Sequence, residues 1–266
     1  MPTSQPAFFF GHGSPLQAIE ETPASQLWSA CGAELVDPRA ILCVSAHWFV
    51  HLTAVTAMAH PRTIHDFYGF PAALYDVQYP APGDPGLAEE VVEHLAPAYC
   101  GLDVDSWGLD HGAWSVLRHL RPAADVPVLQ LSVHASIPLA EHLALGRRLA
   151  GLRERGIALV MSGNVVHNLA RLDPAATAAG SDWAQRFDAA ARQAMTTDPQ
   201  AIATLDAHLD FALASPTLDH LAPLAYLAGL AAEEGRTCEV LLERLEWGSL
   251  SMTSYRLSAE GDPRPR

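Results

Sequence analysis

Histidine is the residue type in this chain whose placement points most directly to chemistry. His12 follows the aromatic run Phe8 to Phe10, and His47 follows the apolar run Ile41 to Val44. His167 follows a third apolar run more loosely, after a short polar segment. Such runs are typical of buried strands, and ligands of open α/β sheets collect at the carboxyl ends of the strands. The sequence therefore predicts a site made of imidazoles that strand ends deliver.

A fourth histidine, His220, lies in the first turn of a helix predicted over residues 218–230, after Ser215-Pro216-Thr217. Three imidazoles from His12, His47 and His220 would suit Zn, Fe, Cu or Ni and would be poor ligands for Mg or Ca. The chain has no H-E-x-x-H and no C-x-x-C, so it lacks the compact zinc motifs. Spacing alone therefore leaves two hypotheses open, a metal site or three unrelated core or loop histidines.

The elements that must position these histidines alternate between strand and helix patterns. Alternation of this kind favours an α/β fold with one domain and a mixed, mostly parallel central sheet covered by helices on both faces. We expect this domain to span residues 1–258 and the tail 259–266 to be frayed. The predicted strands are 7–10, 41–45, 53–59, 102–104, 126–133, 157–161, 237–245 and 249–257, and the predicted helices are 85–98, 114–120, 137–155, 183–196, 199–213 and 218–230.

The composition narrows the class of partner. The 266 residues are 49% hydrophobic and carry a net charge of −14, which argues against a nucleic-acid partner because phosphate binding needs a basic face. The apolar stretch 41–59 is interrupted by histidines and is a poor membrane span. Four scattered cysteines without C-x-x-C, and an amino terminus without a basic signal-peptide segment, favour a reducing, cytoplasmic setting. Nothing in the sequence specifies an oligomeric state.

Several short motifs occur in an order that resembles one enzyme family. Together they are similar to the DOPA-type extradiol ring-cleavage dioxygenases of class III, which are related to the protocatechuate 4,5-dioxygenase catalytic subunit. The resemblance covers nearly the whole chain, and each motif is weak by itself. The motifs are Gly11-His12-Gly13-Ser14-Pro15, Ser45-Ala46-His47-Trp48, Thr63-Ile64-His65-Asp66-Phe67, Tyr79-Pro80-Ala81-Pro82-Gly83, Asp110-His111-Gly112-Ala113-Trp114, Gln130-Leu131-Ser132, Gly163-Asn164-Val165-Val166-His167-Asn168, Ser215-Pro216-Thr217-Leu218-Asp219-His220 and Gly248-Ser249-Leu250-Ser251-Met252.

The resemblance implies a role for each histidine in these motifs. His167 matches the family's acid–base residue near the metal. Fe(II) is the implied working metal, with Zn(II) as the alternative bound metal, and a catechol such as L-DOPA reacts with O2. The implied metal ligands are His12, His47 and His220, and the residues implied to border the substrate pocket are His65 and His111.

One position departs from the related protocatechuate enzymes, which hold Fe(II) with two histidines and a glutamate. This chain offers His220 at the third place, as DOPA-type members do. Asp219 is adjacent, but neighbouring side chains on a helix point different ways, so we expect it to point elsewhere. Two other hypotheses stay open: a zinc-dependent hydrolase that uses the same three histidines, and a metal-retaining catechol-binding protein without turnover. The aromatic segment Phe67 to Phe70 would either stack on a substrate ring or fill the core.

Overall fold

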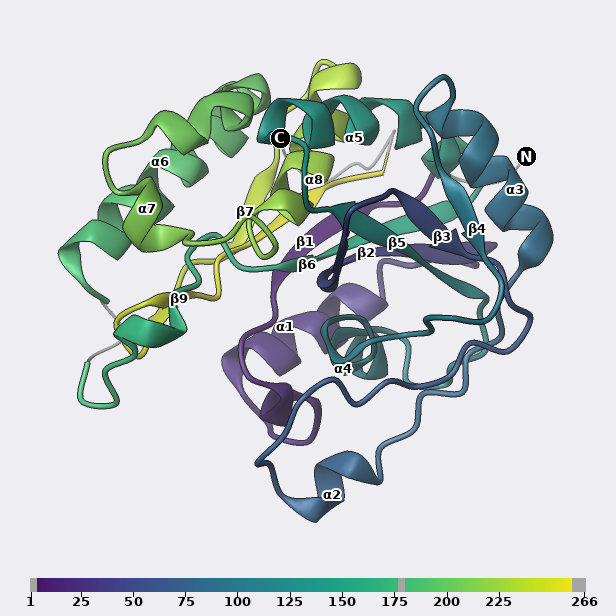
Figure 1. Cartoon of the computed structure of the whole chain (residues 1–266), viewed down its shortest axis with the longest axis horizontal. Coiled ribbons are helices and arrows are strands. Elements are labelled where there is room, and N and C mark those ends of the chain that lie inside the picture. Colours follow the sequence, from purple (N-terminus) through teal and green to yellow (C-terminus); the bar gives the residue numbers. More distant parts are fainter. Residues whose placement is uncertain (1–3, 177–179, 260–266) are drawn as a thin grey trace.

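A central eight-stranded sheet runs through the computed structural model, which describes residues 4–176 and 180–259 (Figure 1). The strand order is β4-β3-β5-β2-β6-β1-β10-β7. The four central strands are parallel to one another, while β3 and β10 join them in antiparallel fashion on either side. The strands are β1 (Ala7–Gly11), β2 (Ala40–Val50), β3 (Ala54–Thr56), β4 (Gly101–Asp103), β5 (Val128–His134), β6 (Ile157–Gly163), β7 (Glu239–Leu242) and β10 (Ser254–Leu257).

Helices cover both faces of this sheet and enclose two apolar cores (Figure 1). One face carries η1 (Pro15–Ala18), α1 (Pro23–Gly32), α2 (Ala72–Tyr75) and α4 (His111–Leu120). The other face carries α3 (Pro85–Leu95), α5 (Leu139–Glu154), α6 (Asp182–Thr197), η3 (Pro199–Ala207), α7 (Phe211–Ala214) and α8 (Ala222–Glu233).

Strand β1 shows why both faces must be covered. Its residues are fully buried, and they alternate between the two cores: Ala7 and Phe9 pack into one, and Phe8 and Phe10 into the other. Successive side chains of a strand point to opposite faces, so an unbroken apolar run requires packing on both sides. The predicted fold class is confirmed. None of the described helices has the length and apolar character needed to cross a membrane.

Two predicted helices start three or four residues away from the expected position. The predicted helix 218–230 begins at Ala222, because Pro223 has no N–H and is tolerated only in the first turn. His220 therefore lies in a turn before α8 and not in its first turn. The predicted helix 114–120 begins at His111, where the Asp110 side chain accepts the Ala113 N–H and caps the helix.

The predicted helix 199–213 is broken in two. A 3-10 helix, η3, ends at Ala207, and the short helix α7 begins at Phe211. Between them the His208 ring accepts the Asp210 N–H at 3.1 Å, so a side chain takes the place of a helical carbonyl.

The closing strands are also interrupted. β7 and β10 join the main sheet, while β8 (Leu245–Glu246) and β9 (Leu250–Ser251) form a separate two-stranded sheet. The predicted tail 259–266 lies, from residue 260 onward, outside the described residues.

Candidate metal centre

Strand register brings the first two histidines to the same edge of the sheet. β6 lies between β1 and β2, with Gly11 of β1 opposite Gly163 and Ser45 of β2 opposite Ser162. His12 directly follows β1, and its N–H donates to the Gly163 carbonyl at 3.1 Å. Because these strands are parallel, their carboxyl ends deliver His12 and the later part of β2 to one place.

His47 is delivered by an irregularity within β2 and not by the end of the strand. Val44 pairs with Leu131 and Phe49 pairs with Val133, so β2 advances five residues where β5 advances two. The predicted strand 41–45 is therefore too short, because β2 resumes pairing and continues to Val50. Bulges of this kind redirect side chains and are common beside active sites. The irregular segment contains His47.

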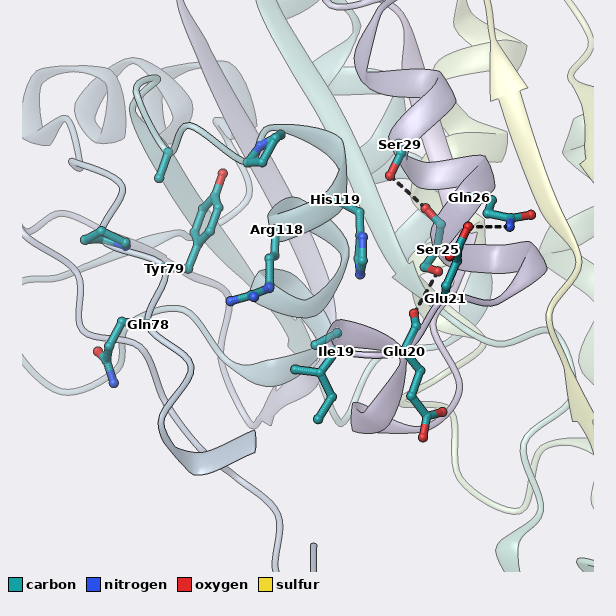
Figure 2. Close-up of a pocket in the computed structure, with 14 residues that line it drawn as sticks. Ile19, Glu20, Glu21, Ser25, Gln26, Ser29, Gln78, Tyr79, Arg118 and His119 are labelled. Atoms are coloured by element: carbon teal, nitrogen blue, oxygen red, sulfur yellow. Dashed lines mark hydrogen bonds between the residues drawn. The ribbon is translucent and has the colours of Figure 1, made fainter. Parts of the chain in front are cut away.

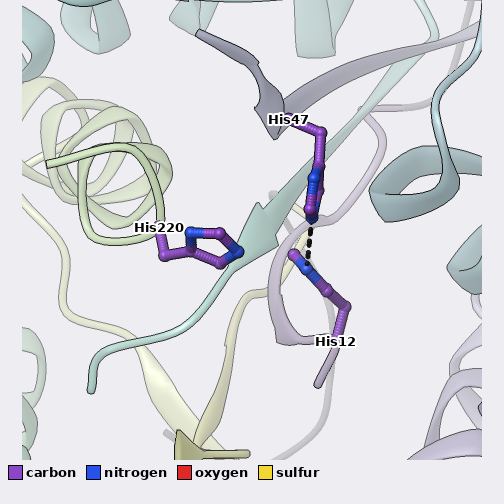
Figure 3. A group of neighbouring side chains, drawn as sticks. All are labelled: His12, His47 and His220. Carbon is purple, nitrogen blue, oxygen red and sulfur yellow. Dashed lines mark hydrogen bonds between the residues drawn. The ribbon is translucent and has the colours of Figure 1, made fainter. Parts of the chain in front are cut away.

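His12, His47 and His220 form one compact group in which one ligand atom of each lies within 4.8 Å of the others (Figure 3). His12 Nε2 is 3.0 Å from His47 Nε2. The ring of His220 points toward this pair, with its centroid 5.3 Å from that of His12 and 5.1 Å from that of His47. His12 and His220 are almost fully buried.

Two glycines allow the segments that carry these histidines to lie close to neighbouring segments of the chain. A Cβ on Gly163 would lie 2.2 Å from the carbonyl oxygen of His220. A Cβ on Gly112 would lie 2.7 Å from His47 Cδ2 and 2.5 Å from Ser45 Oγ. Any larger residue at either position would displace a histidine of the group.

The hydrogen bonds of Ser162 determine which nitrogen of His12 carries the proton. The Ser162 hydroxyl donates to the Gly112 carbonyl at 2.6 Å, so it has no second proton to give. It lies 3.0 Å from His12 Nδ1, which must therefore be the donor. This leaves the Nε2 lone pair of His12 directed at His47.

Carboxylates lie beside the outer nitrogens of the other two histidines. His47 Nδ1 is 3.2 Å from Asp66 Oδ2. His220 Nδ1 is 3.3 Å from Asp219 Oδ1, although no aligned hydrogen bond forms. A carboxylate or hydroxyl on the outer nitrogen is the usual support for a metal-binding histidine, because it turns the other nitrogen's lone pair inward.

The donor set fits a transition-metal ion. Two nitrogens that each lie about 2.1 Å from one cation, at right angles, are about 3 Å apart, which is the spacing seen between His12 and His47. Two imidazole lone pairs this close would repel each other without a proton or a cation between them. Three imidazoles whose outer nitrogens lie beside a hydroxyl or a carboxylate match the ligand preferences of iron and zinc.

Electrostatics also favour a positive charge at this point. Burial, and then the neighbouring His47 and His220, lower the pKa of His12 well below its usual value. Burial likewise lowers the pKa of His47, but Asp66 and Asp110 outweigh it, so the net pKa of His47 is raised. A proton is therefore more favourable on His47 than on His12, and a bound cation would compete with a proton on His47.

His167 stacks on His220, with ring centroids 3.5 Å apart and planes inclined by 4°. Its backbone N–H donates to the Ala214 carbonyl at 2.8 Å, which fixes the segment after β6. Burial, and then the neighbouring His220, lower the pKa of His167 to about 2. Its imidazole is therefore neutral near pH 7.

The two histidines predicted to border a substrate pocket are placed differently. The ring of His111 lies beside that of His47, with centroids 3.8 Å apart. His65 instead turns away and donates from Nε2 to the Val77 carbonyl at 2.9 Å. It packs against the ring of Trp114, outside the group of imidazoles.

Three polar residues of the centre are missing from the sequence prediction: Asp66, Ser162 and Asp219. Asp219 was expected to point away from His220, and this is wrong, because residues 219–220 form a turn before α8. In that turn Asp219 Oδ1 accepts the His220 N–H at 2.9 Å. Asp66 lies inside one of the motifs of the resemblance, and Ser162 directly follows the predicted strand 157–161. A polar residue at such a place is the signal that could have identified them.

A separate groove of about 750 Å³ lies between η1, α1 and the end of α4 (Figure 2). Its walls include Glu20, Glu21, Arg118 and His119. The His119 ring donates to the Gln17 carbonyl at 2.9 Å and so is already engaged. None of the clustered histidines lines this groove, which is therefore separate from the candidate metal centre.

Comparison with known proteins identifies a class of enzyme with this fold and site. Residues 7–258 match the family described as the catalytic LigB subunit of aromatic ring-opening dioxygenase. A crystal structure of an uncharacterized protein from Escherichia coli K12 superposes with a TM-score of 0.83 at 39% identity, covering 96% of this chain and 100% of that one.

Relatives with assigned names give the branch within that class. A "4,5-DOPA dioxygenase extradiol" of Escherichia coli K12 is 44% identical over 96% of this chain and 95% of its own length. A protein of the same name from Beta vulgaris is 33% identical over 95% of this chain and 96% of its own length. The chain belongs to the class III extradiol dioxygenases, in the DOPA-type branch. It is an oxidoreductase that opens aromatic rings with O2, and the resemblance seen in the motifs is confirmed.

Proposed function

We propose that this enzyme opens the ring of an L-DOPA-like catechol beside its two hydroxyls, with Fe(II) held by His12, His47 and His220. The observation that carries the proposal is the convergence of these three imidazoles, with a nitrogen–nitrogen spacing of 3.0 Å that suits one cation. The substrate class is taken from the names of the relatives, which refer to 4,5-DOPA.

Bound Fe(II) would supply a redox-active centre at which a catechol and O2 react, which Zn(II) does not offer. In the same proposal His167 is the acid–base residue. The support for this role is the position of its ring, which is half-buried and stacks on that of His220 beside the proposed metal ligands.

The substrate is proposed to lie against His111, beside which Phe67 packs edge-on with centroids 5.5 Å apart. His65 would then not contact the substrate. It would support the pocket indirectly, because its ring packs against Phe67 and Trp114. Cleavage beside the diol converts the hydroxyl-bearing carbon into a carboxylate and its neighbour into an aldehyde, so both atoms of O2 enter the product.

The setting of the enzyme belongs to the same proposal. Cys31, Cys43, Cys100 and Cys238 are buried thiols, which suits a reducing cytoplasm. The catalytic domain is proposed to span residues 1–258, and the family match covers 7–258 of it.

The experiment is anaerobic reconstitution with Fe(II), followed by L-DOPA or another catechol and air. We expect oxygen consumption and a yellow ring-opened product. Activity with Zn(II) under argon would instead favour the hydrolase. Tight catechol binding without oxygen uptake would favour a binding protein, although the family membership argues against both alternatives.

His167→Ala is expected to keep iron and to lose most turnover, because it removes the proton acceptor and leaves the three proposed ligands in place. Iron content is measured by elemental analysis and turnover by oxygen uptake. His12→Ala and His47→Ala should instead lose the iron. His60→Ala, at an exposed histidine, is the matched control and should change neither quantity. Normal turnover by His167→Ala would refute the acid–base assignment.

A further inference from the structure

Asp66 lies between two imidazoles that come from different parts of the fold. Its Oδ2 is 3.2 Å from His47 Nδ1, and its Oδ1 is 2.9 Å from His111 Nδ1. Oδ1 also accepts the backbone N–H of His111 at 2.9 Å. One carboxylate therefore contacts a proposed metal ligand on β2 and the first residue of α4.

The segment that carries Asp66 is held firmly by its neighbours. The preceding residue, His65, donates from Nε2 to the Val77 carbonyl at 2.9 Å. The residue before that, Ile64, accepts a hydrogen bond from Trp114 Nε1 at 2.7 Å. The Asp66 side chain is 19% exposed, so most of its surface is covered by neighbouring protein atoms.

The carboxylate selects one tautomer of His47. An ionised carboxylate only accepts hydrogen bonds, so the proton of His47 belongs on Nδ1 when the ring is neutral. The lone pair is then on Nε2, the atom that lies 3.0 Å from His12 Nε2 inside the imidazole group. This is the tautomer that can bind a metal there.

We infer that Asp66 is a positioning residue for the metal centre, which holds His47 in its metal-binding tautomer and fixes His111 beside it. The inference rests on the proposed function, because it assumes that His47 is a ligand. Removing a carboxylate of this kind from a metal-binding histidine typically lowers metal affinity or activity about 10–100-fold. Because the carboxylate is shared, the orientation of His111 is coupled to that of His47.

Asp66→Asn is the sharpest change, because it keeps the shape of the side chain and removes half of its accepting capacity. The remaining carbonyl oxygen still accepts the His111 N–H, which turns the amide NH2 toward His47 Nδ1. His47 Nδ1 must then accept a hydrogen bond from this amide, so the proton of the neutral His47 ring moves to Nε2. There it competes directly with the metal.

The test uses Co(II) as an optical probe of the full-length protein under argon. We expect Asp66→Asn to bind Co(II) about 10–100-fold more weakly than the wild type and to shift its visible absorption bands. Melting of the metal-free variant checks that it is folded, and Asp66→Ser takes its place if it is not. The matched control is Asp76→Asn, an equal charge change at an exposed position at the end of α2, which should leave affinity and spectrum unchanged.

The outcomes separate this inference from the proposed function. Wild-type affinity and spectrum in Asp66→Asn, together with loss of Co(II) from His47→Ala, would refute the positioning role and leave the metal site standing. If the wild type and His47→Ala bind Co(II) equally, both the positioning role of Asp66 and the proposed metal site are refuted. Two Co(II) ions per wild-type chain and one in Asp66→Asn would make Asp66 a direct ligand of a second ion with His47 and His111, which also overturns the inference.

Discussion

At the scale of single residues, the close packing of backbone against the histidine rings matters as much as the identity of the ligands. Gly112 lets the His47 ring pass over the first turn of α4, and an added Cβ would meet His47 Cδ2 at 2.7 Å. Real Cβ atoms do not tolerate such distances, so the histidine would have to move. The lack of a side chain at Gly112 therefore helps to keep His47 in its place within the candidate metal centre.

Gly112→Ala is expected to weaken metal binding strongly while costing only about 1–3 kcal/mol of stability, because overpacking is relieved by displacing a side chain. Metal affinity is measured by chelator competition and stability by urea unfolding. Gly151→Ala is the matched control, since its Cβ meets nothing closer than 3.5 Å and alanine favours a helix. Unchanged metal affinity in Gly112→Ala would show that His47 does not need its present position.

The sequence predicts the members of this centre unevenly. His12, His47, His167 and His220 follow recognisable patterns, and the structure brings them together, while their roles stay predictions. The contact made by Asp66 depends on how a loop folds back over α4, which no periodicity encodes. The same holds for His65, whose side chain turns toward Val77 because a carbonyl is available there.

At the scale of elements, the amino-terminal end of α4 is fixed by the buried carboxylate of Asp110, which accepts hydrogen bonds from four donors. Asp110 Oδ1 accepts from Ser45 Oγ at 2.6 Å and from the Ala113 N–H at 3.1 Å. Oδ2 accepts from Gln130 Nε2 and, at 3.4 Å, from Trp107 Nε1. All four contacts need an acceptor, and together they fix the helix terminus that carries His111.

Asp110→Asn should therefore destabilise the protein by about 2–4 kcal/mol, because an amide must point its donors at donors already present. Urea unfolding gives the free energy. Asp84→Asn is the comparison: Asp84 also caps a helix, but asparagine caps as well as aspartate at a site with a single backbone donor. Equal small losses in both variants would contradict the account of the buried network.

The ends of elements are where sequence and structure differ most. Pro223 shows in retrospect that α8 cannot begin much earlier than Ala222, and this is a local rule that the sequence contains. The continuation of β2 past His47 is different in kind, since it depends on renewed pairing of Phe49 with Val133 on another strand. Local patterns cannot report such pairing.

At the scale of the whole molecule, one arginine joins the two ends of the described chain. The Arg153 side chain on α5 is only 1% exposed. It donates to the carbonyl of Gln5 at 2.8 Å and to those of Leu257 and Ser258 at 3.2 and 2.5 Å, and it pairs with Glu234.

Arg153→Met is expected to cost about 3–5 kcal/mol, because it leaves buried carbonyl groups and a carboxylate without their donor. The melting midpoint and urea unfolding measure the loss. Arg155→Met, two residues further on, removes an exposed pair with Glu90 and should cost at most about 1 kcal/mol. Similar losses of unfolding free energy in the two variants would mean that the hydrogen bonds of Arg153 to both ends of the described chain do not stabilise the fold.

The alternation of strands and helices predicts the class of fold, but not the order of strands in the sheet. β10 inserts between β1 and β7, so the last described strand lies beside the first. The pattern of apolar residues in a strand predicts which of its faces is buried. It does not predict which edge of the sheet a strand near the end of the sequence will join.

That placement of β10 has a consequence for synthesis on the ribosome. β1 is translated before its outer neighbour β10, and His220 is translated after all four strands of the parallel core. The nascent chain can form local helices and the β2–β5 pair as it grows, but the proposed ion site stays incomplete until His220 has left the ribosome. A metal ion is thus expected to find all three proposed ligands only after that point.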